Sequence, residues 1–242
     1  MSGPYPTSLT LVRHAESAGN VANDAALEAG LPELDLASRD MDVPLSELGE
    51  AQATALGAWF AGRPSPPDVV WCSPYRRAVD TATLALAAAG LDVPIRLDER
   101  LREREFGVLD RLTKLGIEAR FPEQAAARAF LGKFFHRPPG GESWADVAAR
   151  VRSIVTDLRL DHAHEDVVVV THQAVIMLFR YVLDGLDEAA LLGLDDTIDI
   201  ANTSVGTYEG DGSSLRLTKF NNTDHLPERA TTDEPDRPVA PR

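Results

Sequence analysis

Short apolar runs alternate with longer amphipathic stretches along most of the chain. Four brief runs predict strands; they span residues 9–12, 69–72, 93–98 and 166–172. The last of these gives the strongest signal, because it contains consecutive valines from Val167 to Val170. Near the C-terminal end, residues 203–210 and 214–220 flank a glycine-containing turn and predict a β-hairpin.

The amphipathic stretches predict helices; they span residues 46–62, 76–90, 142–160 and 173–185. In the first, Ser46 can cap the helix. Its spacing predicts an apolar face made of Leu48, Ala51, Ala55 and Trp59. Residues 21–43 predict a long loop with one helical turn at most, and residues 100–137 predict several helical pieces.

The helix predicted at residues 142–160 has the clearest pattern. Ser143 and Asp146 have the spacing of a capping box at its start. Behind them runs an apolar stripe made of Val147, Val151, Ile154, Val155 and Leu158. This helix should therefore pack one full face against the core.

Strands that alternate with helices indicate an α/β fold. We expect a three-layer sandwich, with a mostly parallel central sheet and helices on both faces, because continuous aliphatic strands are typical of buried parallel sheets. Residues 1–225 should form a single domain. Residues 226–242 are rich in proline and charge and predict a disordered tail.

Composition and charge limit the partners. The chain has 242 residues and a formal net charge of −14, so nucleic acid and anionic membranes should repel it. It has no apolar run long enough to span a bilayer, no evident secretory signal and a single cysteine, Cys72. These features favour a cytoplasmic protein that acts on a small molecule. The sequence does not predict an oligomeric state.

Polar residues stand where the predicted strands end. His14 follows the first strand, Arg76 and Arg77 follow the second, and His172 ends the strongest. In a parallel α/β sheet, ligands bind at the carboxyl ends of the strands. A neutral histidine is a competent nucleophile and arginine matches phosphate oxygens, so this combination predicts phosphoryl chemistry that needs no metal or other cofactor.

The same residues carry a family resemblance. The stretches "LVRHAESAGN", "CSPYRRAVDTA", "LREREFG", "PPGGES", "VVTHQAVI" and "ANTSV" occur in this order between Leu9 and Val205. Together they resemble the motifs of the histidine phosphatase superfamily, whose members are phosphoglycerate mutase-like. The resemblance implies the phosphoglycerate mutase-like α/β fold and a phosphohistidine intermediate.

The resemblance also implies roles for individual residues. His14 would attack phosphorus, and Glu103 would protonate the leaving oxygen. The phosphoryl oxygens would be held by Arg13, Asn20, Arg77 and His172. Two departures from the family pattern are Ala15, in place of the usual glycine, and Gln173-Ala174 after the second histidine. The second departure also occurs in the fructose-2,6-bisphosphatase branch, so it is compatible with catalysis but weakens the transfer of a mutase role.

Several alternatives stay open at this stage. Glu103 lies in a run of charged residues that could simply be solvated. Lys133, His136 and Arg137 could bind a second anionic part of the substrate or cover the surface. The expected function is a metal-independent phosphomonoesterase for small phosphorylated metabolites. The alternatives are a phosphoglycerate mutase that uses the same residues and a catalytically silent protein that binds phosphorylated ligands.

Overall fold

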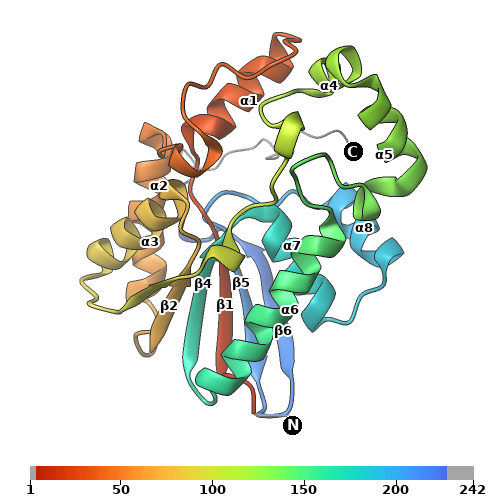
Figure 1. Ribbon diagram of the computed structural model, residues 1–242. Coiled ribbons are helices and arrows are strands. Elements are labelled where there is room, and N and C mark those ends of the chain that lie inside the picture. Colours follow the sequence, from red (N-terminus) through yellow and green to blue (C-terminus); the bar gives the residue numbers. More distant parts are fainter. Residues whose placement is uncertain (1–3, 228–242) are drawn as a thin grey trace.

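A six-stranded mixed sheet forms the centre of the protein in the computed structural model, which describes residues 4–227 (Figure 1). The strands are β1 Ser8–Arg13, β2 Val69–Cys72, β3 Ile95–Leu97, β4 Asp166–Thr171, β5 Val205–Gly210 and β6 Leu215–Asn222. All four predicted strands and the predicted hairpin are therefore confirmed. The predicted disordered tail, residues 226–242, lies outside the described residues except for its first two positions.

The strand order is β3-β2-β4-β1-β5-β6. Neighbouring strands from β3 to β1 are parallel, whereas β5 pairs antiparallel with β1 and β6 antiparallel with β5. The mostly parallel sheet predicted from the aliphatic runs is thus confirmed. Every residue of β4 from Val167 to Thr171 is buried, as expected for a central strand covered on both faces.

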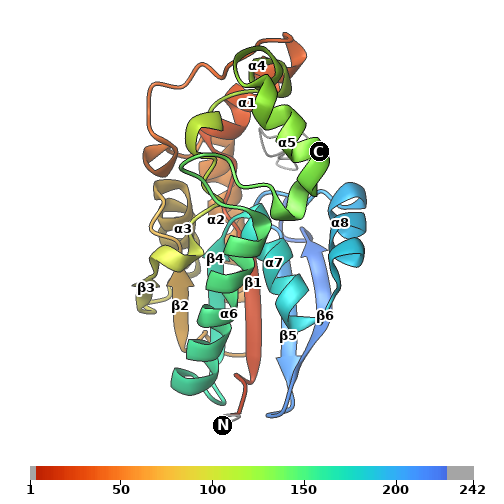
Figure 2. The same ribbon diagram turned by 45° about the vertical axis from the view of Figure 1, so that its right-hand side comes forward.

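Helices cover both faces of the sheet, which gives three layers (Figures 1 and 2). Helices α6 (Trp144–Asp161), α7 (Gln173–Leu183) and α8 (Glu188–Thr197) share a core with one face, and there Leu9 and Val169 pack with Ile154. Helices α2 (Glu47–Ala61) and α3 (Arg76–Ala89) share a core with the other face, around Val168 and Leu56. The predicted three-layer sandwich is confirmed.

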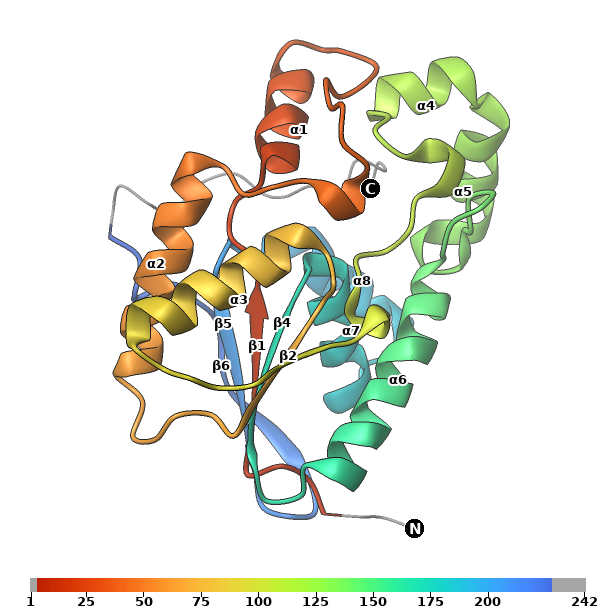
Figure 3. The ribbon, with the colours of Figure 1, turned by 60° about the vertical axis from the view of Figure 1, so that its left-hand side comes forward.

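A smaller group of helices stands beyond the carboxyl ends of the parallel strands, above the sheet in Figure 3. These are α1 (Ala18–Glu28), α4 (Lys114–Arg120) and α5 (Pro122–Phe135), and short 3₁₀ turns lie at Asp40–Asp42, Glu99–Leu101 and Gly107–Leu109. The long-loop prediction for residues 21–43 was partly wrong, because α1 occupies its first third. Ser17 and Asn20 form a capping box that starts this helix, and the sequence reading missed it.

The predicted apolar face of α2 was also wrong. Ala51 is exposed, whereas Gly49, Ala53 and Gly57 are buried. Small residues allow this face to approach its neighbours closely: a Cβ on Gly57 would lie 2.6 Å from Cβ of Ala88 in α3. The buried face of α2 therefore combines the large side chains of Leu56 and Phe60 with small residues that allow a close approach to α3.

Helix α6 matches its prediction. All five residues of the predicted stripe are buried, and the capping box of Ser143 and Asp146 is present. It is 18 residues long. Among residues 4–227, no helix is both long enough and apolar enough to cross a membrane.

The close contact between α2 and α3 can be tested by adding one methyl group. Gly57→Ala should lower the free energy of unfolding by about 1–3 kcal/mol, because the contact overrides the higher helix propensity of alanine. Gly193→Ala in α8 is the matched control, because a Cβ there meets nothing within 4 Å. It should leave the protein equally stable or stabilise it. Urea denaturation measures both, and equal effects of the two substitutions would contradict the packing described.

Candidate active site

Two histidine rings meet at the carboxyl ends of neighbouring strands. His14 follows β1 and His172 follows β4, and their ring centroids are 5.0 Å apart. The register pairs Arg13 with Thr171, so the next residue of each strand emerges at the same level. The sheet thus brings together two histidines that are far apart in the sequence.

Backbone contacts fix the segment that carries His14. The His14 amide donates to the carbonyl oxygen of Thr171 at 2.9 Å. Its own carbonyl oxygen accepts from Nδ2 of Asn202 at 3.0 Å and from the amide of Thr203 at 3.3 Å. The next amide, of Ala15, donates to Oγ1 of Thr81 at 3.0 Å. Ala15 is not among the described residues with positive φ, so alanine fits in place of the family's usual glycine.

The His14 ring is oriented for attack through one nitrogen. Nδ1 lies 2.7 Å from the carbonyl oxygen of Ala15. Because a carbonyl oxygen only accepts, Nδ1 carries the proton and Nε2 keeps its lone pair. Burial, reinforced by the charges of Arg77 and Arg13, lowers the pKa of His14 well below its usual 6.5. The imidazole is therefore neutral and nucleophilic at physiological pH.

Ser73 orients the second imidazole. Its Oγ lies 2.8 Å from Nε2 of His172 and accepts the amide of Tyr75 at 3.2 Å. A hydroxyl that accepts from an amide is well placed to donate its own proton to Nε2, which leaves the ring proton on Nδ1. Burial lowers the pKa of His172 well below 6.5, and the charge of Arg77 adds to this effect.

Two arginines supply buried positive charge. Arg13 is 0% exposed, and its Nη1 donates to the carbonyl oxygen of Ile200. Arg77, in the first turn of α3, is 5% exposed, and its guanidinium lies 5.0 Å from the centre of the Tyr75 ring. Both charges act on His14, as the lowered pKa of that residue shows. Arg76, by contrast, is exposed and pairs with Asp80.

Asn20 lies in the first turn of α1 and faces the same space. Its Oδ1 accepts from the amide and from the hydroxyl of Ser17, at 2.9 and 2.8 Å. These contacts fix the orientation of the side-chain amide, so its Nδ2 is the end that can donate to an anion. The capping box therefore gives Asn20 a structural role as well as a place in the pocket.

Glu103 also lines this pocket. One carboxylate oxygen accepts the amide of Arg104 at 2.7 Å, and the other lies 3.5 Å from the amide of Ala174, in the first turn of α7. Helix N-termini favour negative charge. The carboxylate is therefore positioned by two backbone amides from different segments.

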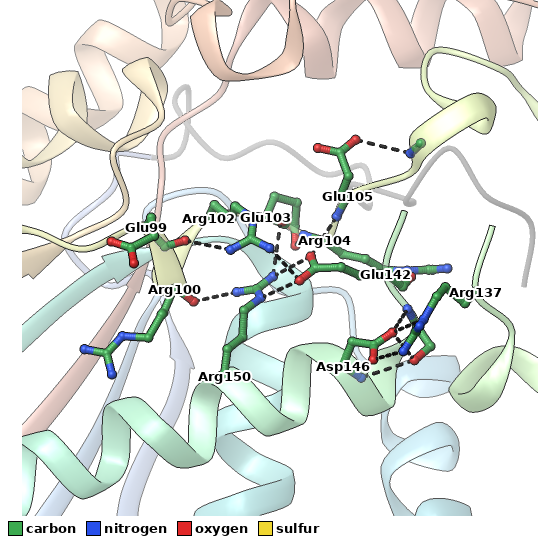
Figure 4. Close-up of polar contacts among 12 residues, drawn as sticks. Glu99, Arg100, Arg102, Glu103, Arg104, Glu105, Arg137, Glu142, Asp146 and Arg150 are labelled. Atoms are coloured by element: carbon green, nitrogen blue, oxygen red, sulfur yellow. Dashed lines mark hydrogen bonds and ion pairs between the residues drawn. The ribbon is translucent and has the colours of Figure 1, made fainter. Parts of the chain in front are cut away.

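An ion-pair network fixes the segment around Glu103 (Figure 4). The carboxylate of Glu142 accepts from Arg102 at 2.7 Å and from Arg150 at 3.0 Å. Arg150 also donates to the carbonyl oxygen of Glu103 at 3.2 Å, and Arg104, only 3% exposed, donates to the carbonyl oxygen of Glu142 at 2.7 Å. Much of the charged run is thus folded into the protein rather than solvated.

These groups border an open pocket at the carboxyl ends of the strands. Four of the expected residues line it: His14, Asn20, Arg77 and Glu103. Arg13 and His172 lie behind them, fully buried. The other lining residues mix apolar side chains with acids and arginines, among them Leu34, Phe106, Asp110 and Arg111.

The three residues whose role the sequence left open lie elsewhere. Lys133 pairs with Asp195, and its Nζ lies 4.6 Å from the centre of the Trp144 ring. Arg137 is largely exposed and pairs with Asp146, and Nε2 of His136 lies 3.3 Å from Oε1 of Gln124. None of the three is among the described residues that line the pocket.

Sequence reasoning missed several supporting residues. Ser73, Tyr75 and Thr81 hold the two imidazole segments in place, but nothing in the sequence indicated which side chain each would meet. Asp40 was missed completely, because it lies in the stretch predicted to be a loop. It pairs with Arg77 through both carboxylate oxygens, at 2.9 and 3.3 Å.

Comparisons with known proteins agree with this geometry. A model of the histidine phosphatase superfamily (branch 1) matches residues 9–223. The chain therefore belongs to the histidine phosphatase superfamily of enzymes. A 2,3-bisphosphoglycerate-dependent phosphoglycerate mutase of Methylobacterium radiotolerans is 36% identical over 184 residues, which cover 75% of this chain and 81% of that protein.

Mycobacterial proteins give further matches. The bifunctional protein Rv2228c of Mycobacterium tuberculosis is 35% identical over 88% of this chain, but the chain spans only about half of it, 53%. Among solved structures, mycobacterial glucosyl-3-phosphoglycerate phosphatase Rv2419c in complex with inorganic phosphate has a TM-score of 0.68 and 28% identity, covering 91% of this chain and 100% of that one.

The protonation state of the two histidines can be measured by NMR titration. Because burial and the arginines disfavour the charged form, the ring signals of His14 and His172 should not shift as the pH falls from 8 to 6.5. In the unfolded chain both histidines become protonated below about pH 6.5, whereas in the folded protein they stay neutral. The free energy of unfolding should therefore decrease as the pH is lowered below 6.5. The ring signal that disappears in the His14→Asn variant identifies the resonance of His14. Titration midpoints at or above 6.5 would contradict the electrostatics described.

Proposed function

We propose that this protein hydrolyses small phosphomonoesters through a phosphohistidine at His14, without a metal. The observation that carries the proposal is the 5.0 Å approach of two buried, neutral imidazoles beside Arg13 and Arg77. A phosphoryl group bound there would meet a nucleophilic nitrogen on one side. On its other sides it would meet donors that neutralise its charged oxygens.

The first half of the reaction forms the phosphoenzyme. The lone pair on Nε2 of His14 attacks phosphorus, and the bond to the leaving oxygen breaks. Arg13, Arg77, Nδ1–H of His172 and Nδ2 of Asn20 donate to the phosphoryl oxygens. Glu103, entering as the carboxylic acid, transfers its proton to the leaving alkoxide. The products of this step are a free alcohol and phosphohistidine.

The second half releases phosphate. The carboxylate of Glu103 takes a proton from a water molecule, whose oxygen attacks phosphorus. The phosphorus–nitrogen bond breaks, and Nε2 of His14 recovers its lone pair. The two half-reactions use the same groups in opposite directions, so the enzyme returns to its starting state.

The name of the Methylobacterium relative keeps a mutase as a second candidate, since both reactions begin with the same phosphoenzyme. The pocket favours hydrolysis. Asp40 pairs with Arg77, and Asp110 lines the pocket beside Arg111, so acidic groups offset part of its positive charge, whereas retention of a sugar-acid phosphate needs extra positive charge. Lys133 and Arg137 already have acidic partners. A product assay with 3-phosphoglycerate and 2,3-bisphosphoglycerate separates the two: hydrolysis releases phosphate, whereas a mutase forms 2-phosphoglycerate.

The nucleophile can be identified by trapping. Rapid quenching of the protein with ³²P-labelled p-nitrophenyl phosphate should give one acid-labile, alkali-stable phosphoryl group. His14→Ala should remove the label and lower kcat at least about 10³-fold. A protein that only binds phosphorylated ligands would show neither label nor released phosphate, and that result would exclude the proposal.

The acid can be identified by varying the leaving group. Glu103→Gln should lower kcat/KM for an alkyl phosphate about 10²-fold or more. It should lower the rate of phosphoenzyme formation from p-nitrophenyl phosphate much less, because that leaving group departs without a proton. Glu105→Gln is the matched control, since Glu105 is an exposed neighbour. Equal losses with both leaving groups would rule Glu103 out as the acid.

A further inference from the structure

Arg77 has an acidic partner inside the phosphate pocket. Nη1 donates to the carbonyl oxygen of Asp40 at 2.7 Å and to its Oδ1 at 2.9 Å, and Nη2 lies 3.3 Å from its Oδ2. Asp40 thus receives three contacts from the two terminal nitrogens of the Arg77 guanidinium, which carry four of its five N–H groups. The carboxylate therefore occupies the forked end of the arginine, the geometry that a phosphate group also uses.

The two partners differ in burial. The Arg77 side chain is 6% exposed and that of Asp40 is 40% exposed. The guanidinium also lies 5.0 Å from the centre of the Tyr75 ring, so Arg77 is held in place without the carboxylate. Asp40, in contrast, already contacts solvent, and moving away from Arg77 would cost it little hydration.

The position of Asp40 in the chain allows such an exchange. It is the first residue of the 3₁₀ turn Asp40–Asp42, within the long connection between α1 and α2. Its backbone carbonyl also bonds Arg77, so the turn can stay attached while the carboxylate rotates. Asp40 lines the same pocket as His14, and its charge contributes to raising the pKa of Asp110, which places the two acids near each other.

We propose that Asp40 is a positioning residue that competes with phosphoryl oxygens for Arg77 and thereby weakens the retention of inorganic phosphate. This inference rests on the proposed function of the site. Free phosphate must displace the carboxylate and has only the contacts of its phosphoryl oxygens to offset this cost. A substrate meets the same cost but makes additional contacts through its leaving group, so it can bind well while phosphate is held weakly.

The test compares two neighbouring acids. Asp42 lies in the same turn and pairs with Arg39 at 2.8 Å, with both side chains exposed. Asp40→Asn and Asp42→Asn thus change the net charge equally, but only the first removes the competing carboxylate. The inhibition constant for phosphate, measured against p-nitrophenyl phosphate, should fall about fivefold or more for Asp40→Asn and stay within about twofold for Asp42→Asn.

A gain in affinity distinguishes competition from a merely structural role, because damage to the pocket would weaken binding. Asp40→Ser provides a second variant, and thermal melting checks that both fold. An unchanged or higher inhibition constant in both Asp40 variants, or an equal gain in Asp42→Asn, would overturn the inference. Calorimetry with inorganic phosphate needs no turnover, so it tests Asp40 even if the protein fails to hydrolyse esters.

Discussion

The pairing of β1 with β4 is the constraint on which the rest of the site depends. Leu9 opposes Val167 and Arg13 opposes Thr171 across two buried parallel strands. A one-residue slip of β1 would move Leu9 and Leu11 out of the core that contains Ile154, so packing fixes the register. The same register sets the positions of His14 and His172, one residue beyond the pairing. The geometry of the two imidazoles is thus a consequence of core packing.

Burial then gives the site its chemistry. A solvated histidine would be partly protonated near neutral pH, but here desolvation and two arginines keep His14 neutral. Positive charge and an unprotonated imidazole therefore coexist in one site. Backbone amides hold the carboxylate of Glu103 in the same pocket, and the ion-pair network of Glu142 and Arg150 fixes the segment that carries it. Glu103 and His14, the proposed acid and the proposed nucleophile, are held by different elements, and the proposed reaction cycle needs both in place.

Much of this could be predicted from the sequence. The valine run of β4, the stripe of α6 and the order of the motifs indicated the fold and the residues that now line or border the pocket. The sequence could not predict α1 or the buried face of α2, because a capping asparagine and close glycine contacts decided them. Nor could it predict that Asp40 faces Arg77, since that contact depends on how the 18-residue connection between α1 and α2, from Ala29 to Ser46, folds.

The most direct test of the central claim is a crystal structure of the protein with orthovanadate. The account predicts a vanadate ion bonded to Nε2 of His14, with Arg13, Arg77 and Nδ1 of His172 within hydrogen-bond distance of its equatorial oxygens and Glu103 beside the apical oxygen. Vanadate bound away from both rings, or a His14 whose Nε2 turns away from it, would contradict the account.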